Sequence, residues 1–456
     1  MTNALAETAM DRLRSLGAVS DAYEKTARRL TEDGWAVLSE TSNSMLLVGV
    51  PGLPLATQVA WLDGIVVGVW PRLAIERQRL AIISSRLTRK LGGHPDWFDA
   101  FRTLACQIDA DRQLLITADG TTSDRFVHRA SKLFGLPLCS IRLSNQQPVE
   151  VIETFGAKSD GDIHLSRLIP NKDNGPISGP IADRTLIAVA NQLRALRVTS
   201  GSNTERLLRT RLNDTSFPAA SIHVSRDAEA SLVLAESGAV TRVFLRAEGG
   251  SSEQDPSVAS PCQSEPPFDN YLLHWTRSPD GPWPDEEEAD YLDNLILGVE
   301  ATDRTAFAAL ARILQMKRLI ASSHLIRGGF EVVCFSQLSL DQLIERRVYR
   351  RHLHRWDFEP YGIGIRKSVL TELGAKPVTY AASETFEELD QTERPFFQSV
   401  GTESGVNWRH ENEWRHVGDV SLSRIAPNAA FVFAPTEQEA STLSELSGWP
   451  GVVVKK

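Results

Sequence analysis

Cysteine is scarce in this chain, and its cysteines never stand close together. Cys106, Cys139, Cys262 and Cys334 are widely separated, and no two of them have CxxC spacing. A disulfide scaffold and a zinc ribbon both need cysteines grouped at short intervals, so this spacing argues against both. We expect no bound metal.

Long apolar runs are also missing. No window holds the roughly eighteen uninterrupted apolar residues of a membrane span. The apolar stretches that do occur, such as residues 64–70, have the length of a strand. The first residues lack a basic segment followed by an apolar one, which a secretory signal would show. We therefore expect a cytoplasmic protein that makes no membrane contact.

Excess positive charge is the third absence. The 456 residues carry a formal net charge of -9, so the chain as a whole lacks the character of a dedicated nucleic-acid binder. A local basic groove could still bind DNA or RNA. Arginine is concentrated between residues 346 and 355, and this run fits either a solvated helix face or a phosphate-binding surface.

One break in composition predicts a domain boundary. Residues 248–268 are rich in glycine, serine and proline and almost free of large apolar side chains, as expected of a linker. The break divides the chain into domains at 1–247 and 269–456, each long enough to bury a core. A second polar stretch, at 159–180, is interpreted as a long loop inside the first domain.

The first domain alternates apolar strand candidates with helical patterns. Residues 80–83, 114–117 and 186–189 are the clearest strand candidates, and small polar residues follow the first two. Such alternation predicts a mostly parallel α/β sheet covered by helices. Ligands of these sheets bind beyond the carboxyl ends of the strands, where small residues let the backbone approach a phosphate. Each turn also fits a simple strand-to-helix connection.

Five short motifs follow one another here, at 81–86, at 120–124 with His128 beyond it, and at 183–188, 200–204 and 236–239. In this order they resemble the Rossmann-like domain of the DNA-processing protein DprA and the wider SLOG superfamily. The resemblance implies a bound nucleotide-derived ligand or single-stranded DNA. It departs from the family at Ser84 and at 118–119, where the family usually has glycine. The ligand-binding residues that it implies are Ser84, Arg86, Gly120, Asp124, Ser200 and Gly201.

The second domain carries motifs at 271–276, 311–323, 332–336, 361–363, 377–380 and 411–415. Together they resemble the AbiGi-type abortive-infection proteins and, more distantly, the DarT-like and other ADP-ribosyltransferases. This resemblance implies a C-terminal α+β domain of ADP-ribosyltransferase type, a role in phage defence, and NAD as substrate.

The transferase resemblance assigns chemistry to four polar residues. When nicotinamide leaves NAD, the ribose becomes oxocarbenium-like, so the transition state most needs a nearby carboxylate. Glu413 is the predicted carboxylate, and Glu411, on the same face if the segment is a strand, would orient the acceptor. His274 would bind the adenosine ribose, and Ser336 would brace the nicotinamide side or Glu413. Tyr361 and Tyr380 are alternative candidates for stacking on nicotinamide.

Each of these residues also has a purely structural interpretation. A histidine in an aromatic strand, as His274 is, is commonly a packed core residue with a satisfied hydrogen bond. Glu413 or Glu411 could simply pair with Arg415 across an exposed strand, where an ion pair contributes little to stability.

Two functions from different classes remain open. In the first, the protein is a phage-defence enzyme whose first domain senses a nucleotide or DNA and whose second domain transfers ADP-ribose or hydrolyses NAD. In the second, it is a non-enzymatic antitoxin or regulator that binds a ligand or a partner toxin. An open cleft of NAD size around Glu413 favours the first function, and a filled cleft favours the second. An oligomer is compatible with both.

Overall fold

The computed structural model describes the chain except residues 1, 20–22, 145–146, 154, 156–160, 171–176, 218–220, 244–269, 280, 300–302, 324–325, 346, 348, 351–354, 357–358, 401–411 and 455–456. The chain forms two compact units. Unit 1 is Met1–Gly249 with Glu287–Thr302, and unit 2 is Gly250–Glu286 with Asp303–Lys456. The predicted linker at 248–268 lies outside the described residues. The sequence-based division places 287–302 in the second domain, whereas these residues group with unit 1. The domain boundary at the linker stays a prediction.

Unit 1 contains eleven of the described helices and ten strands: α1 (Thr2–Ser15), α2 (Tyr23–Asp33), β1 (Trp35–Glu40), β2 (Ser44–Gly49), α3 (Leu55–Leu62), β3 (Gly64–Pro71), α4 (Arg72–Glu76), β4 (Gln78–Ser84), α5 (Pro95–Cys106), β5 (Gln113–Ala118), α6 (Asp124–Phe134), β6 (Leu138–Ser144), α7 (Pro148–Glu153), β7 (Ile163–Pro170), α8 (Ile181–Val189), β8 (Gln192–Arg197), α9 (Asn203–Asn213), β9 (Ile222–Ser225), α10 (Ser231–Glu236), β10 (Val240–Arg242) and α11 (Glu288–Leu297).

The ten strands form one sheet in the order β1-β2-β3-β7-β6-β5-β4-β8-β9-β10. Neighbours from β7 to β10 are parallel, whereas β1, β2 and β3 pair antiparallel with one another and β3 with β7. The chain moves outward from β4 through β5 and β6, then returns to β8 on the other side of β4. This reversal is the topology of a Rossmann-like fold, so the predicted parallel α/β class is confirmed.

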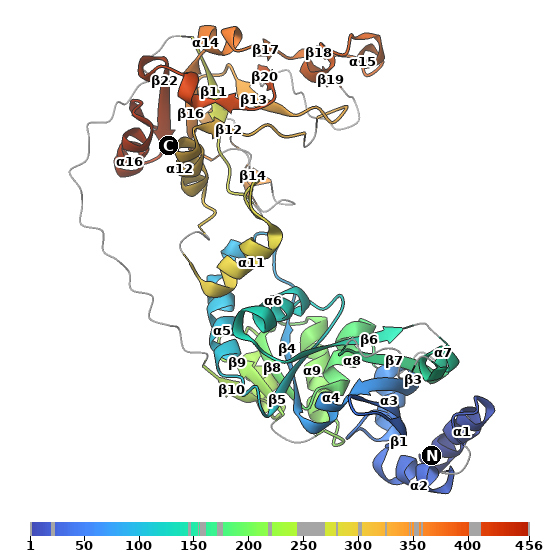
Figure 1. Ribbon diagram of the computed structural model, residues 1–456. Helices are drawn as coiled ribbons and strands as arrows, with labels where there is room; N and C mark the ends of the chain where they lie inside the picture. The colour runs from blue at the N-terminus through green and yellow to red at the C-terminus, as the bar shows by residue number, and fades with distance from the viewer. Residues whose placement is uncertain are drawn as a thin grey trace. The chain divides into compact units, whose positions relative to one another are not determined.

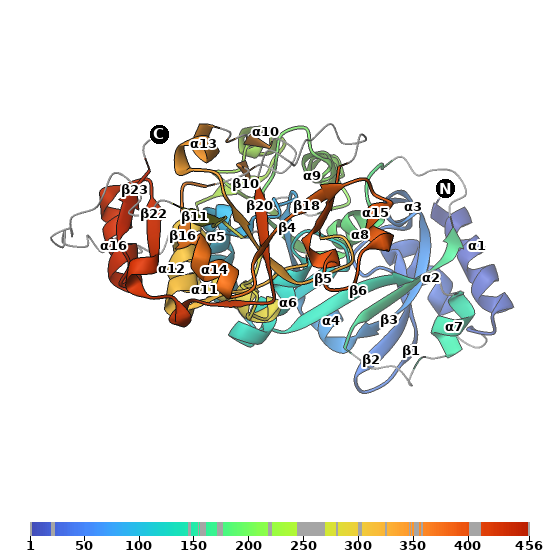
Figure 2. The ribbon, with the colours of Figure 1, turned by 90° about the horizontal axis from the view of Figure 1, so that it is seen from above.

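Helices cover both faces of the parallel strands (Figure 1). Alternate residues of β4, β5 and β8 point to a core shared with α8 and α9, and the others point to a core shared with α5, α6 and α11. Alternation along a strand dictates this division, because successive side chains point to opposite faces. At the β1–β3 end, α1 and α2 pack on a third core. Figure 2 shows these two helices beside that end of the sheet from another side.

Two sequence-based assignments in unit 1 were wrong. The apolar run at 186–189 is the end of helix α8, and the strand begins only at Gln192. Every residue from Arg184 to Val189 is buried, and a short apolar run fits a buried helix as well as a buried strand. Residues 159–180 are not only a loop, since they contain β7, whose partly alternating burial marks it as a strand.

Unit 2 contains the remaining described α-helices and strands: β11 (Tyr271–Trp275), α12 (Ala306–Met316), β12 (Arg318–Leu319), β13 (Val332–Ser336), α13 (Leu340–Glu345), β14 (Tyr349–Arg350), β15 (Arg355–Trp356), β16 (Gly362–Arg366), α14 (Lys367–Glu372), β17 (Lys376–Pro377), β18 (Thr379–Ala381), α15 (Thr385–Glu388), β19 (Phe397–Ser399), β20 (Glu413–Val417), β21 (Val420–Ser421), β22 (Ala430–Ala434), α16 (Glu437–Ser447) and β23 (Gly451–Val453).

Seven strands of unit 2 form a sheet in the order β17-β20-β13-β11-β16-β22-β23. All neighbours are antiparallel except β22 and β23. One face packs on α12 and α16, which lie beside β22 in Figure 1. The other face builds a smaller core around Phe431 and Phe433. Unit 2 is therefore an α+β domain, as the sequence predicted.

Two glycines of β16 let large rings pack against the middle of this sheet. A side chain at Gly362 would come within 2.2 Å of the His274 carbonyl oxygen and 2.4 Å of the Phe433 ring, and one at Gly364 would collide with the Phe431 ring. Glycine here allows β16 to lie close beside β11, the strand that carries His274.

The arginine-rich run at 346–355 lies partly outside the described residues. Where its backbone is described, β14 pairs with β15 antiparallel, Tyr349 with Trp356 and Arg350 with Arg355. The interpretation as a helix face was therefore wrong for this part, and phosphate binding stays a prediction.

Two features are absent from the described residues. No helix among them combines the length and the apolar character needed to cross a bilayer. No group of histidine, cysteine or acidic side chains among them is arranged to hold a metal ion.

Candidate functional site

A cleft of about 700 Å³ opens in unit 2 beside β11, β13, β20 and α12. Its volume lies within the range of small-molecule sites, which are commonly 300–1,000 Å³. His274, Ser336 and Glu413, the three residues that the sequence predicted to converge, all line it. Its other polar and aromatic lining residues include Trp275, Thr276, Arg277, Trp283, Asp285, Arg312, Arg318, Ser322, Cys334, Phe335, Gln398 and Arg415.

The cleft lies where two neighbouring strands separate. β11 and β13 share a single register pair, Leu273 with Ser336, whereas β13 and β20 pair over five residues. Ser336 stands opposite Glu413, so these two point to the same face of the sheet. His274 follows Leu273 and therefore points to the opposite face. The cleft thus reaches both faces of the sheet at this separation.

His274 bridges the two strands at the point where their pairing ends. Its Nδ1 lies 3.0 Å from the carbonyl oxygen of Cys334, and its ring packs edge-on against Phe335. A carbonyl can only accept, so Nδ1 carries the hydrogen in this geometry. Desolvation lowers the pKa of His274, more than the Cys334 carbonyl raises it, and this favours the neutral ring. Nε2 is then a hydrogen-bond acceptor on the cleft wall.

Glu413 is held by one arginine through both carboxylate oxygens. Arg415 donates from Nε to Oε1 at 2.8 Å and from Nη2 to Oε2 at 3.1 Å. The Arg415 side chain is 2% exposed and that of Glu413 is 15% exposed, so the pair is mostly shielded from water. The structural alternative, a pair on an exposed strand, is therefore wrong about exposure although right about the partner.

All five N–H groups of Arg415 are satisfied. Besides the two bonds to Glu413, Nη1 donates to the carbonyls of Pro395 and Phe397 at 3.0 and 2.9 Å, and Nη2 donates to Gln398 Oε1 at 2.8 Å. The guanidinium thus cannot turn toward a ligand without losing several of these bonds. Its geometry fixes the carboxylate of Glu413 at the edge of the cleft.

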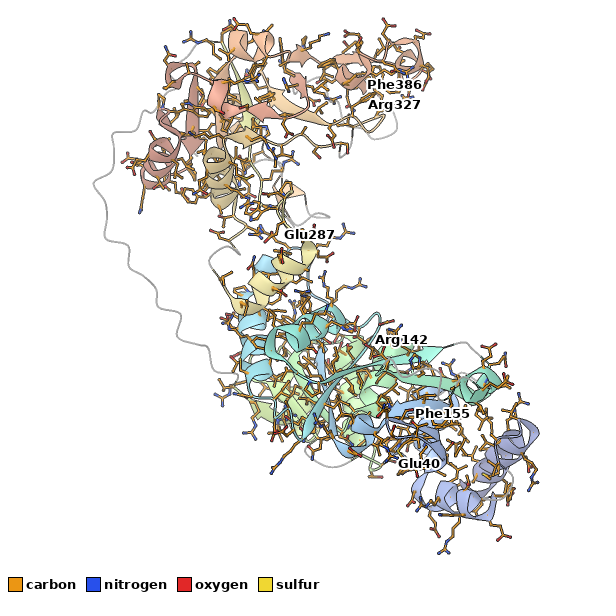
Figure 3. The ribbon with its side chains drawn as sticks, in the orientation of Figure 1. Glu40, Arg142, Phe155, Glu287, Arg327 and Phe386 are labelled. Carbon is orange, nitrogen blue, oxygen red and sulfur yellow. The ribbon has the colours of Figure 1, made fainter. Side chains whose placement is uncertain are left out.

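The segment that accepts from Arg415 is itself anchored. Phe397 is 1% exposed and packs on Phe386 at 5.5 Å between ring centroids. Arg327 lies over the Phe386 ring at 4.3 Å and donates to the carbonyl and the hydroxyl of Ser383. Figure 3 shows Arg327 and Phe386 side by side.

Cys334 is the third group beside the carboxylate. It stands opposite Arg415 in the register and opens into the cleft, but surrounding protein desolvates it. This desolvation and the negative charge of Glu413 raise the pKa of the Cys334 thiol to about 12. Cys334 is therefore a neutral thiol at neutral pH, which excludes it as a thiolate nucleophile. It lies where its S–H can donate to Glu413.

The other predicted site residues of unit 2 are Tyr361, Tyr380 and Glu411. Tyr361 donates its hydroxyl to Glu439 at 2.8 Å and packs on Phe307, and Tyr380 accepts from the Glu413 amide at 3.3 Å. Both tyrosines are described, and neither is among the residues that line the cleft, although the Tyr380 hydroxyl lies against the Glu413 amide. The stacking role of either ring stays a prediction. Glu411 lies outside the described residues, and its role stays a prediction.

Sequence reasoning missed the wall formed by residues 283–285 and α12. Arg312 forms a bidentate pair with Asp285, at 2.8 and 3.0 Å, and lies over the Trp283 ring. The aromatic rings that do line the cleft are Trp275, Trp283 and Phe335. No local motif marks this wall, because its two halves are joined only by long-range pairing.

In unit 1, the predicted ligand residues lie at the carboxyl edge of the sheet. Ser84 ends β4, Gly120 lies two residues beyond β5, and Ser200 lies three beyond β8. These strands are parallel neighbours with β4 in the middle, so the edge is shared, as the sequence predicted. The binding role of these residues stays a prediction.

Most polar groups at this edge are already satisfied. Ser85 Oγ accepts from the Thr199 amide at 3.0 Å and lies 3.2 Å from Ser202 Oγ, so it bridges the point where the strand order reverses. Trp97 donates to Ser84 Oγ at 3.1 Å. At the start of α9, the Glu205 carboxylate accepts from the Gly201 amide at 2.6 Å, which is the place an anion would take.

Asp124 and Arg86 complete the edge. Thr117 donates to Asp124 at 2.8 Å, and His128 lies 3.6 Å from the same carboxylate oxygen. Burial raises the pKa of Asp124, more than the Thr117 hydrogen bond lowers it. Arg86 is exposed. Beside Gly201, a groove of about 410 Å³ runs along α9 and is lined by Arg206 and Arg209, among others.

No protein-family model and no curated protein matches the sequence. Among solved structures, the chain is similar over its N-terminal part to DNA processing protein A from Helicobacter pylori, a structure described for its single-stranded DNA binding mode. The match has 16% identity and a TM-score of 0.27, and it covers 45% of this chain and 90% of that one. DprA from Streptococcus pneumoniae is 12% identical with a TM-score of 0.27, and this match covers 40% of this chain and 64% of that one. At these TM-scores neither likeness carries an argument, and the fold of unit 1 is established by its own strand order.

Proposed function

We propose that the cleft of unit 2 binds NAD and breaks its nicotinamide glycosidic bond, and that unit 1 binds a nucleotide-derived ligand or DNA that controls this reaction. The observation that carries the proposal is the carboxylate of Glu413, which Arg415 holds through both oxygens at the edge of a cleft of sufficient size. A fixed carboxylate is the group that an oxocarbenium-like ribose needs most.

The reaction would proceed by loss of the leaving group. The bond between C1′ of the ribose and the pyridinium nitrogen breaks, and its electron pair leaves with nicotinamide, which becomes neutral. The carboxylate of Glu413 stabilises the positive charge on the ribose and accepts from its 2′-hydroxyl. The oxygen of water or of an acceptor then bonds to C1′ and loses its proton to solvent. The products are nicotinamide and free or transferred ADP-ribose.

The acceptor capacity of Glu413 fits this role. A carboxylate offers about four lone-pair sites, and Arg415 occupies one on each oxygen. The neutral thiol of Cys334 takes part in the same cluster. At least one site therefore remains for a ribose hydroxyl, while the charge stays compensated by the guanidinium.

His274 and Ser336 supply the remaining polar contacts. Neutral His274 presents Nε2 as an acceptor for a ribose hydroxyl, because its Nδ1 is bonded to the main chain. Ser336 lies opposite Glu413, where it can brace the nicotinamide side. Tyr361 and Tyr380 stay the predicted stacking rings, and Trp275 and Trp283, which line the cleft, are further candidates.

In unit 1, the ligand would approach the carboxyl edge near Gly120. The backbone there has a φ of +88° with open space where a side chain would stand, so a phosphate can come close to the main chain. Replacing Gly120 with a bulky residue would weaken nucleotide binding and leave unit 2 folded. With the abortive-infection resemblance, this arrangement fits a phage-defence protein in which a sensed ligand controls NAD use.

The decisive experiment measures nicotinamide release from NAD by the purified full-length protein, with NAD binding followed by calorimetry on the same samples. Binding with release supports the enzyme. Binding without release, with and without a nucleotide panel and oligonucleotides, supports the alternative of a non-enzymatic antitoxin or regulator. Absence of NAD binding contradicts the proposal for unit 2.

A further inference from the structure

Helix α11 is an insertion from the chain of unit 2 that completes the core of unit 1. The residues before it, up to Glu286, and after it, from Asp303, belong to unit 2. Within unit 1, its buried side chains join the core formed by α5 and α6. These are Tyr291, Leu292, Leu295 and Ile296, each at most 5% exposed.

Polar contacts fix the register of α11 on this surface. Arg129 of α6 forms a bidentate pair with Asp293, with Nε donating to Oδ1 at 2.6 Å and Nη2 donating to Oδ2. Arg102 of α5 donates to the carbonyl of Ile296 at 3.2 Å. A second ion pair, Arg125 with Glu288 at 3.3 Å, is more exposed. Three neighbouring arginines thus hold one short helix.

The two ends of the insertion are joined at its base. Glu286, which precedes the inserted segment, pairs with Arg304, which follows it, at 2.6 Å, and their side chains are 12% and 2% exposed. Arg304 lies over the Trp283 ring at 4.4 Å. Trp283 lines the cleft of unit 2, as do Asp285 and its partner Arg312. The base of the insertion therefore adjoins the cleft wall, through Arg304 over the Trp283 ring and through Asp285, which precedes Glu286.

The surface that receives α11 is continuous with the ligand edge of unit 1. Helices α5 and α6 follow β4 and β5, whose ends carry Ser84 and Gly120. Trp97 of α5 donates to Ser84 Oγ and packs in the same core as α11. A ligand that moved this edge would shift the surface on which α11 is seated.

Building on the function proposed above, we propose that α11 is the coupling element between unit 1 and the cleft. Seated on α5 and α6, it holds the Glu286–Arg304 base closed and keeps Trp283 and Asp285 in the cleft wall. A helix of this length is unstable in water on its own, so its two states are seated helix and unseated chain. The ligand of unit 1 would act by shifting that equilibrium.

The test is hydrogen exchange on the full-length protein carrying Asp293→Arg, which places a guanidinium against Arg129. We expect exchange about tenfold faster in α11 and also in residues 283–286 and α12, because the base opens when the helix leaves its seat. The exchanged pair, Arg129→Asp with Asp293→Arg, should restore protection in all three. Glu288→Arg, at the more exposed pair, is the matched control and should change little.

Faster exchange confined to α11, with 283–286 and α12 unchanged, would overturn the coupling and leave α11 as a structural part of unit 1. If Asp293→Arg unfolds unit 1 altogether, Leu295→Ala replaces it as a milder way to weaken the seat, with the same two outcomes. None of these measurements requires NAD, so an inactive cleft would contradict the proposed function without affecting this result. If the cleft does release nicotinamide, Asp293→Arg should change its rate severalfold.

Discussion

The two units each place a glutamate at the candidate site, but in opposite ways. Glu205 of unit 1 turns toward its own backbone and accepts from the Gly201 amide. Glu413 of unit 2 is held from behind by Arg415, with the cleft beside it. A carboxylate that accepts from the backbone amides of a site occupies the place of an anionic ligand. A carboxylate that a buried cation holds from one side can accept from a ligand on the other side. The difference makes unit 2 the stronger candidate for chemistry.

The largest effect should come from neutralising the presented carboxylate. Glu413→Gln keeps the shape but removes the charge that stabilises the ribose cation, so nicotinamide release should fall at least about 100-fold. Glu236→Gln, on α10 of unit 1 and outside both candidate sites, is the control and should leave release within a small factor of wild type. Equal losses in both variants, measured with the same assay, would mean that the loss is not specific to the carboxylate of the cleft.

The next largest effect should be a loss of unfolding free energy when Arg415 is replaced. Arg415→Met leaves Glu413 without its cation and the carbonyls of Pro395 and Phe397 without a donor, so unit 2 should lose roughly 3–5 kcal/mol. Arg318→Met removes a pair with Asp419 whose side chains are nearly half exposed, and should cost under about 1 kcal/mol. Chemical denaturation compares the two. A small loss for Arg415→Met would mean that the carboxylate is not anchored as described.

How far the sequence predicted the site depends on the kind of information involved. The closeness of Glu413 and Ser336 could be predicted because each lies in or at the start of a strand-like segment, and the pairing of those strands brings them together. The choice between the two tyrosines could not be made from the sequence, because closeness to a motif does not say which way a ring points. The anchoring of Glu413 was underestimated, since the acceptors of Arg415 come from a separate segment.

The fold shows the same limit. The sequence predicted the parallel sheet of unit 1 from apolar runs and the small residues after them, and the strand order confirms it. The run at 186–189 was wrongly predicted as a strand because it is buried on all sides. Such a run is continuously apolar and lacks the alternation of apolar and polar residues that distinguishes a helix from a strand. The place of α11 was missed because nothing local tells which core an amphipathic helix will join.

Histidines provide a smaller, pH-dependent comparison of the two units. Burial, together with Arg194 and Arg242, lowers the pKa of His223 in unit 1 to about 4, and desolvation lowers that of His274 in unit 2. The unfolded chain, with a histidine pKa near 6.5, binds more protons than the folded one below that pH, so stability falls as the pH drops from about 6.5. For His223 the loss levels off near pH 4.

Replacing each histidine in turn separates their contributions to the pH dependence of stability. His223→Gln should flatten the pH dependence of the unfolding of unit 1 between about pH 6.5 and 4. His274→Gln should flatten that of unit 2 below about pH 6.5. Thermal unfolding at several pH values, with hydrogen exchange to identify which unit opens, measures both. An unchanged slope in either variant would show that its histidine titrates in the folded protein as it does in the unfolded chain.

The smallest effect should come from opening the site that unit 1 keeps closed. Glu205→Gln removes the negative charge that occupies the Gly201 amide, and Ser202 still caps the helix by accepting from the amide of residue 205. If that charge is what excludes anions, inorganic phosphate and nucleotides should bind a few-fold more tightly to the variant. Calorimetry measures the change, and Glu236→Gln on α10 is the control. Unaltered binding would mean that the contact between Ser85 and Ser202, and not the carboxylate, keeps anions from this edge. Ser85→Ala would then be the variant that binds phosphate and nucleotides more tightly.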